Sequence, residues 1–290
     1  MRRTLTALQV AQAFHDSCLA ELDALKPGNV HRFRDDARIN ARMSVADFER
    51  SARASAPELA GLGLSVGVRI RRAVEATKSA VGQNTNLGII LLAAPLAAAA
   101  LDDATEDLRE RLAGVLAGLS VEDGREAYRA IREAGPGGLG EVSRHDVALE
   151  PNVDLLEAMR TAETYDRIAW NYTHDYADIF DLGLPRLEAA MDRWQSLPFA
   201  TSFVYLGFLA RIPDTLIERK FGSQQAVKVM QEAHRIEARL AESSSPQALM
   251  PQLTTFDHAL RTRGLNPGTS ADLTVATLFA ASLQALEERR

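Results

Sequence analysis

Apolar residues recur at spacings of three and four along almost the whole chain, and this helical period is the feature that most limits how it can fold. Residues 6–25 show the period clearly, with Ala7, Val10, Phe14 and Cys18 on one stripe. Such spacing predicts a helix with one buried face. The alternation of apolar and polar residues that is typical of strands is nearly absent. The pattern therefore predicts an all-α protein.

The same spacing predicts a series of further helices. Residues 84–101 are apolar on every side, so this helix should be central and buried all round. Because no serine-, glycine- and proline-rich linker divides the chain, we expect a single multi-helix domain over residues 1–290. The other expected helices span residues 44–54, 57–77, 106–119, 121–134, 152–180 with a kink near Asn171, 198–211, 226–242, 246–263 and 271–286.

Composition argues against several classes of protein. The chain has 33 Lys and Arg against 39 Asp and Glu, a net charge of −6, which disfavours non-specific binding to nucleic acid or to anionic membranes. A single cysteine, Cys18, excludes an intramolecular disulfide and a cysteine-based zinc site. No signal peptide is expected, and the most apolar stretch, residues 87–101, is too short to span a bilayer. We expect a soluble, cytoplasmic protein with small-molecule partners, and a homodimer is one option for its assembly.

Five polar segments interrupt the helical pattern, and each has both a structural and a functional explanation. The first, residues 26–31, follows a helix end and carries Lys26, Asn29 and His31 on a turn restrained by proline and glycine. Lys26 either interacts with the carbonyl groups at that helix end or contacts a phosphate.

The second segment, residues 83–88, stands directly before the expected central helix and includes Asn84, Thr85 and Asn86. One such side chain is enough to cap a helix, so the surplus favours contact with a ligand. Free N–H groups and the helix dipole at this point suit an anion or a base.

The third segment, residues 135–146, combines a glycine-rich loop containing Gly138 with His145 and Asp146. Glycines let backbone amides approach a phosphate, but the loop lacks the lysine and Ser/Thr of a Walker motif. It is therefore either a surface loop or a functional one.

The last two segments carry acidic and hydroxyl side chains. Asp214 and Glu218 are four residues apart, which on a helix gives either a carboxylate pair for a divalent cation or a capping aspartate followed by a charged turn. Residues 266–272 contain Ser270 and Asp272, which capping of the last helix explains.

Taken in order, these segments resemble the triphosphoribosyl-dephospho-CoA synthase family. The chain reads KPGNV, then GQNTNLGIILL, then PGGLG with HDV, then DTLIERK and NPGTSADLTVATLF, so that the resemblance extends over about residues 11–283. It implies an enzyme that transfers the 5-triphosphoribosyl group of ATP to the ribose 2′-hydroxyl of 3′-dephospho-CoA and releases adenine. Mg²⁺ is the expected cofactor, because a triphosphate needs cations and carboxylates to hold its metal.

The resemblance also implies roles for individual residues. The reaction passes through an oxocarbenium-like state that nearby negative charge stabilises, while a base takes the proton of the attacking hydroxyl. Asp146 is the candidate base, with His145 as second choice, and Asp214 and Asp272 are candidate metal ligands. The candidate substrate contacts are Lys26, Arg219 and Lys220 for phosphates, Asn84, Thr85 and Asn86 for the nucleotide, and also Asn29, His31, Gly138 and Ser270.

The chain departs from the family pattern at three places. Leu87 stands where members have the lysine of an NTxKG motif, and the arginine–glycine–glutamate element near the glycine loop reads Gly138-Leu139-Gly140-Glu141. Lys220 occupies the position of a family arginine and keeps the charge. The acceptor could therefore differ from dephospho-CoA. The alternatives are a related ATP-dependent transferase in tetrahydromethanopterin- or methylofuran-linked one-carbon metabolism and a non-catalytic nucleotide-binding protein.

Overall fold

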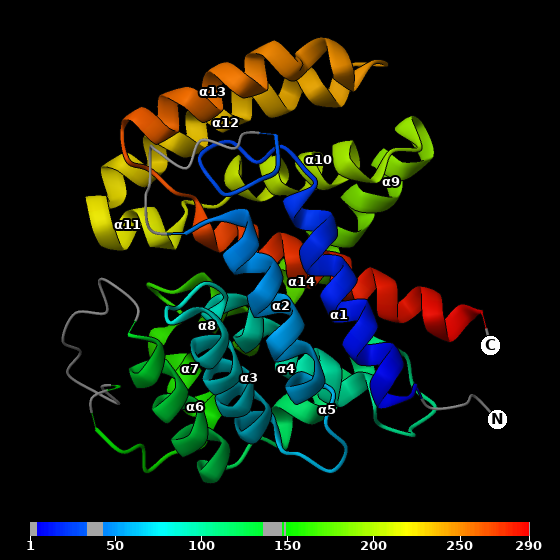
Figure 1. The fold of residues 1–290 in the computed structure, drawn as a ribbon, viewed down its shortest axis with the longest axis vertical. Coiled ribbons are helices and arrows are strands. Elements are labelled where there is room, and N and C mark those ends of the chain that lie inside the picture. The colour runs from blue at the N-terminus through cyan, green and yellow to red at the C-terminus, as the bar shows by residue number, and fades with distance from the viewer. Residues whose placement is uncertain (1–4, 34–42, 136–146, 148, 290) are drawn as a thin grey trace. The chain divides into compact units, whose positions relative to one another are not determined.

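The computed structural model describes residues 5–33, 43–135, 147 and 149–289. Within these residues the chain forms fourteen α-helices, one π-helix and one 3-10 helix, and it contains no β-strand (Figure 1). The predicted all-α class is therefore confirmed. Contacts divide the chain into two compact units, each assembled from separate segments. A single domain over residues 1–290 stays a prediction.

Unit 1 comprises Met1–Ser17, Asp47–Ala177 and Phe279–Arg290. It takes in most of α1 (Ala7–Leu22), most of α2 (Val45–Leu59) and the end of α14 (Gly268–Glu288). The helices that lie wholly inside it are α3 (Val66–Val81), α4 (Leu87–Ala100), α5 (Leu108–Ala117), α6 (Val121–Ala134), α7 (Leu155–Ala162) and α8 (Arg167–Thr173).

Helix α4 is buried at the centre of unit 1, as its uniformly apolar sequence predicts. Twelve of its fourteen residues are buried. Pro95 has no N–H, so the Leu91 carbonyl one turn earlier loses its helical donor. The Tyr172 hydroxyl donates to that oxygen at 2.6 Å, and the Tyr176 hydroxyl donates to the Leu92 carbonyl at 3.1 Å. Two buried tyrosines thus attach α8 and the following turn to the central helix.

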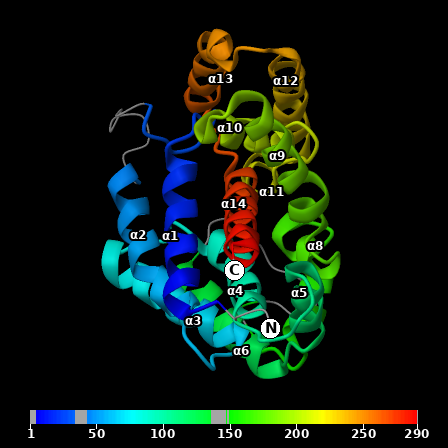
Figure 2. The ribbon, with the colours of Figure 1, turned by 90° about the vertical axis from the view of Figure 1, so that its right-hand side faces the viewer.

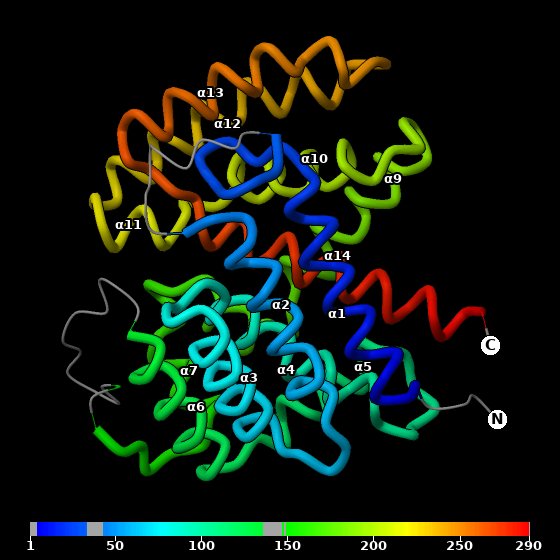
Figure 3. Tube along the Cα trace, in the orientation of Figure 1, coloured from blue at the N-terminus to red at the C-terminus, as the bar shows by residue number. Residues whose placement is uncertain are grey.

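Helices α3 and α6 pack closely side by side because Gly67 has no side chain (Figure 3). A Cβ atom on Gly67 would lie 2.5 Å from the Cα atom of Asp123. Asp123 joins the two helices, since its Oδ1 accepts the Gly67 N–H at 2.7 Å while its Oδ2 accepts from Ser120 at the start of α6. This contact fixes the two helices whose C-terminal ends line the pocket described below.

Unit 2 comprises Cys18–Ala46 and Asp178–Leu278. Its central helix is α10 (Leu197–Leu209), in which residues 200–209 are all buried, and Figure 2 shows α9 and α12 as its neighbours. The end of α1 and the first part of α14 belong to the same unit. Its other elements are η1 (Asp178–Gly183), α9 (Leu184–Trp194), α11 (Thr215–Phe221), α12 (Ser223–Glu242), η2 (Pro246–Leu249) and α13 (Met250–Thr262).

Two of the predicted helices are wrong, and two helices were not predicted. Residues 57–77 do not form one helix, because α2 continues through Pro57 to its end and Gly63, with a φ of 68°, lies in the turn before α3. Residues 152–180 are divided because Asp154 and Asp166 each cap a new helix. Helices α9 and α11 lie outside the predicted ranges. No helix in the described part of the chain is long and apolar enough to cross a bilayer.

Candidate functional site

The predicted site residues are distributed over both units. Gly138, His145 and Asp146 lie outside the described residues, so their roles stay predictions. Of the candidates that the structure describes, Asn84, Thr85 and Asn86 belong to unit 1, and the others belong to unit 2.

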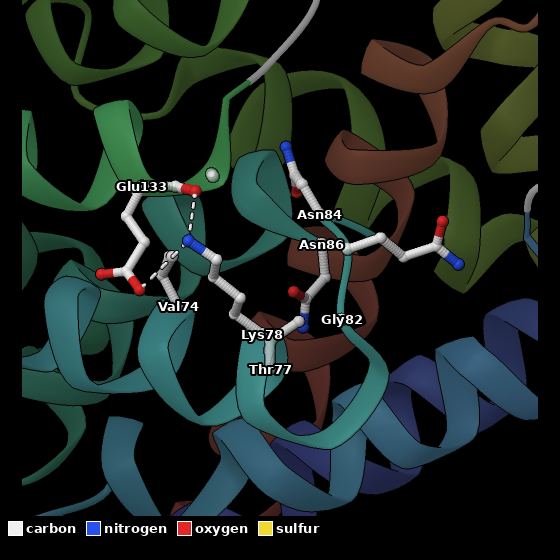
Figure 4. Close-up of a pocket in the computed structure, with 9 residues that line it drawn as sticks. Val74, Thr77, Lys78, Gly82, Asn84, Asn86 and Glu133 are labelled. Carbon is white, nitrogen blue, oxygen red and sulfur yellow. Dashed lines mark hydrogen bonds and ion pairs between the residues drawn. The ribbon is translucent and has the colours of Figure 1, made fainter.

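A pocket of about 100 Å³ lies in unit 1 where three helix ends meet. The last turns of α3 and α6 form two sides, and the segment before α4 forms the third (Figure 4). Asn84 and Asn86, two of the three predicted nucleotide contacts, line this pocket. The structure thus places this polar segment at a cavity.

The three side chains of this segment are used in different ways. Asn84 Oδ1 accepts the N–H of Leu87 at 3.1 Å and so caps α4. Thr85 Oγ1 lies 2.5 Å from the hydroxyl of Ser51 on α2. Asn86 is only 4% exposed and donates from Nδ2 to Ser55 Oγ at 3.3 Å, while its Oδ1 has no partner among the described residues. Capping therefore explains Asn84 but not Asn86.

Two residues of α3 that we did not predict complete the polar lining. Thr77 is 2% exposed, and its hydroxyl has no hydrogen-bond partner in the part of the chain that the structure describes. Lys78 donates from Nζ to the Glu133 carbonyl at 3.3 Å and lies 3.5 Å from Glu133 Oε1 (Figure 4). Lys78 could have been predicted as a site residue, because it is one of only four lysines in the chain and lies five residues before the second polar segment.

In unit 2 the turn that carries Lys26 is buried and held by distant residues. The Tyr205 hydroxyl donates to the Pro27 carbonyl at 2.7 Å, and the Gly28 N–H donates to Asp257 Oδ1 at 2.8 Å. Gly28 has a φ of 83°, and a Cβ there would lie 2.9 Å from the Leu265 carbonyl oxygen. Only glycine fits this close approach.

Lys26 is fully buried and forms an ion pair with Glu21 at the end of α1. Its Nζ also donates to Asn29 Oδ1 at 3.3 Å. Burial lowers the pKa of Lys26 and raises the pKa of Glu21, and the attraction between them opposes both shifts. The lysine's charge is thus compensated inside unit 2, and its side chain has no exposed surface. Glu21 was missed, although its spacing from Phe14 and Cys18 puts it on the buried stripe of α1.

Asn29 and His31 belong to the same buried network. The Asn29 Nδ2 donates to Asn266 Oδ1 at 2.7 Å, and Arg261 donates to both carboxylate oxygens of Asp257 at 2.8 and 3.0 Å. His31 is 1% exposed, with Nε2 3.5 Å from Asp257 Oδ1. Burial lowers the pKa of His31, against the opposing effect of Asp257. Burial acts to raise the pKa of Asp257, but His31, the Gly28 N–H and Arg261 hold it below its usual value.

Asp214 is the N-cap of α11 and joins it to α14. Its Oδ1 accepts the N–H groups of Leu216 and Ile217 at 3.1 and 3.2 Å, and its Oδ2 accepts the N–H and hydroxyl of Ser270 at 2.8 and 2.9 Å. A carboxylate offers about four lone-pair sites, and protein donors occupy all of them. Burial raises the pKa of Asp214 even so. The Ser270 hydroxyl, a predicted substrate contact, is used in the same contact.

Asp214 therefore does not fit its predicted role as a metal ligand. Asp272 is partly exposed, and its negative charge lies near enough to Lys26 to oppose slightly the lowering of that lysine's pKa by burial. Among the described residues, no group of three or more His, Cys, Asp or Glu side chains could hold a metal ion. Arg219 and Lys220 lie in the last turn of α11, where Lys220 is exposed.

Comparison with known proteins connects these observations. A sequence model of the family described as ATP:dephospho-CoA triphosphoribosyl transferase matches residues 7–290. The chain is similar in fold to a solved structure of a candidate triphosphoribosyl-dephospho-CoA synthase from Archaeoglobus fulgidus, with 22% identity, a TM-score of 0.63 and coverage of 81% of this chain and 97% of that one. A search among curated proteins finds no match. Because the family match covers nearly the whole chain, the protein belongs to the ATP:dephospho-CoA triphosphoribosyl transferase family.

Proposed function

We propose that this transferase uses the ribose 2′-hydroxyl of 3′-dephospho-CoA as its acceptor and releases free adenine. The family reaction moves the triphosphoribosyl group of ATP to dephospho-CoA. The observation that carries the proposal is the family match over residues 7–290, which includes every described helix of both units. The polar pocket before α4 supports it locally, since a nucleotide needs such a site.

The proposed chemistry exchanges one bond at the ribose of ATP. The bond from C1′ to the adenine nitrogen breaks, and the acceptor oxygen forms a new bond to C1′ through an oxocarbenium-like state. A base removes the hydroxyl proton, and adenine leaves carrying one proton in place of the broken bond. We assign the base to Asp146, with His145 as second choice, in the segment that follows α6 in the sequence.

The phosphate contacts proposed here are Arg219 and Lys220, two neighbouring cations at the end of α11. Lys26 is a weaker candidate, because Glu21 already compensates its charge. Since Asp214 does not fit a metal, we propose that Mg²⁺ enters as part of the substrate, bound to the phosphate oxygens of ATP and to water.

A direct assay tests the proposal. Purified protein is incubated with ATP and Mg²⁺, with and without 3′-dephospho-CoA, and free adenine is measured by chromatography together with the mass of the acceptor. We expect adenine release that depends on the acceptor and an acceptor that gains the triphosphoribosyl group. ATP binding without adenine release would support a non-catalytic nucleotide-binding protein instead. Asp146→Asn should abolish release, whereas Asp103→Asn, at an exposed aspartate after α4, should not.

One observation favours a second acceptor class. Leu87 occupies the family's lysine position and is only 8% exposed, so this point of α4 carries an apolar side chain and no charge. An acceptor with fewer phosphates than dephospho-CoA would need that charge less. The same assay with pterin and furan one-carbon cofactors as acceptors distinguishes the two, because the faster acceptor gives the larger release of adenine.

A further inference from the structure

Two residues that line the pocket between α3, α4 and α6 each have a buried polar atom that forms no hydrogen bond with the described part of the chain. These are Thr77 Oγ1 and Asn86 Oδ1, in residues that are 2% and 4% exposed. Buried polar atoms are nearly always paired, because an unpaired one destabilises the fold. Two of them beside the same cavity therefore indicate a ligand that supplies the missing partners.

The charge of the described lining argues against a triphosphate as that ligand. Among the described residues, the lining has one cationic side chain, Lys78, and one carboxylate, Glu133, which gives a formal charge of 1 − 1 = 0. The Lys78 ammonium is already directed to the Glu133 carbonyl and carboxylate. A polyphosphate site needs an excess of positive charge and donors, and an unpaired carbonyl oxygen such as Asn86 Oδ1 would repel it.

The unpaired atoms instead match a neutral group with both donors and acceptors. Asn86 Oδ1 can only accept a hydrogen bond, and the Thr77 hydroxyl can donate one. The edge of adenine has this pattern, since its exocyclic amine donates while its ring nitrogens accept. The adjacent amide of Asn84 lies at the same pocket.

The size of the cavity agrees with a part of a nucleotide. About 100 Å³ is several times the roughly 10–15 Å³ that a single water needs. It is also well below the roughly 300–1,000 Å³ of pockets that enclose a whole ligand. One ring system fits these limits better than water or an entire ATP molecule.

We propose that this pocket binds the adenine base of ATP, with Asn86 Oδ1 accepting from the exocyclic amine and the Thr77 hydroxyl donating to a ring nitrogen. The proposal rests on the proposed function, in which ATP is the donor and adenine the leaving group. It adds Thr77 as a binding residue and separates the base site from the phosphate contacts.

Binding measurements on the full chain test this inference. Affinities for ATP, adenine and inorganic tripolyphosphate are measured by calorimetry for the wild type, Thr77→Val and Thr77→Ser. Thr77→Val removes the hydroxyl and nearly keeps the shape, so we expect adenine and ATP to bind about 3- to 10-fold more weakly, while tripolyphosphate binds unchanged. Thr77→Ser keeps the hydroxyl and should retain most of the affinity for adenine.

Three outcomes would overturn the inference: no adenine binding to the wild type, equal adenine affinity in Thr77→Val, or a loss confined to tripolyphosphate. These outcomes are distinct from failure of the proposed function, which the adenine-release assay measures. If the protein releases adenine but binds adenine equally well with and without the Thr77 hydroxyl, the adenine base binds elsewhere, and the proposed transferase activity is still supported. If adenine binding depends on Thr77 but no adenine is released from ATP, the adenine site is supported and the proposed transferase function is contradicted.

Discussion

Two polar segments that look alike in the sequence are used differently in the two units. The segment before α4 in unit 1 places Asn86 at the lining of a pocket, and its Oδ1 has no hydrogen-bond partner among the described residues. The turn over residues 26–31 in unit 2 is buried, and most of its polar groups bind other residues of the same unit. Excess polarity at a helix end therefore marks either a ligand site or an internal network. The presence of internal partners distinguishes the two.

The largest expected effect concerns the buried ion pair of the network. Lys26→Met leaves the Glu21 carboxylate buried without its cation, so the free energy of unfolding should fall by about 3–5 kcal/mol. The double variant Glu21→Leu/Lys26→Met removes both charges and should recover most of that loss. Urea unfolding measures both. If Lys26→Met kept its stability but lost ATP binding, Lys26 would be a phosphate contact and the contrast between the segments would fail.

A smaller loss is expected for the cap that joins α11 to α14. Asp214→Ala removes the acceptor of four hydrogen bonds and should lower the free energy of unfolding by about 2–4 kcal/mol. Glu133→Ala is the matched change at the pocket, and it should stay within about 0.5 kcal/mol because that side chain is partly exposed. The same urea titration compares them. If Glu133→Ala lowered the free energy of unfolding as much as Asp214→Ala, the Glu133 side chain would stabilise the fold as much as the α11 cap does.

The all-helical class and the central helix α4 were predictable because both follow from local periodicity. The buried face of α1 was visible in the same way, and so was the break at Gly28. The ends of α2, α7 and α8 were not, because they depend on single capping residues and on a proline that the last turn of α2 accommodates. A single capping residue contributes little energy, so tertiary packing can override it, and the spacing of apolar residues does not reveal that packing.

The candidate site was only partly predictable, for a different reason. The partners of the Lys26 turn, Tyr205, Asp257 and Arg261, lie roughly 180–230 positions further along the chain. No local pattern shows that such residues meet. Thr77 lay in an ordinary helical stripe, and only the absence of a partner for its hydroxyl points to the pocket.

The pH dependence of stability should carry a contribution from His31 in unit 2. Burial lowers its pKa, and Asp257, Arg261 and Lys26 are the charged groups near it. In the unfolded chain His31 binds a proton near pH 6.5, whereas in the folded protein it does so only at lower pH. The contribution of His31 to the free energy of unfolding is therefore complete above about pH 6.5 and is lost as the pH falls. We plot the free energy of unfolding against pH. Between about pH 6.5 and the lower pKa of folded His31, His31→Gln should reduce the slope of this plot by up to about 1.4 kcal/mol per pH unit. Exposed His234→Gln is the control, and equal slopes in both variants would contradict the assignment.

The smallest expected effects are the changes in stability when one hydroxyl is removed from each unit, and these two changes should have opposite signs. Ser202→Ala in unit 2 removes a hydroxyl that donates to the Leu25 carbonyl at 2.9 Å, so it should cost about 1 kcal/mol. Thr77→Val removes a buried hydroxyl without a partner, so the free protein should gain about 1 kcal/mol in urea unfolding. Adenine at one fixed concentration, well above both dissociation constants, should then raise the wild type's stability more than the variant's, because the stabilisation grows with the logarithm of the ratio of ligand concentration to Kd. If the hydroxyl served only packing, the stability difference between the wild type and Thr77→Val would be the same with and without adenine, and the contrast between the two segments would be lost.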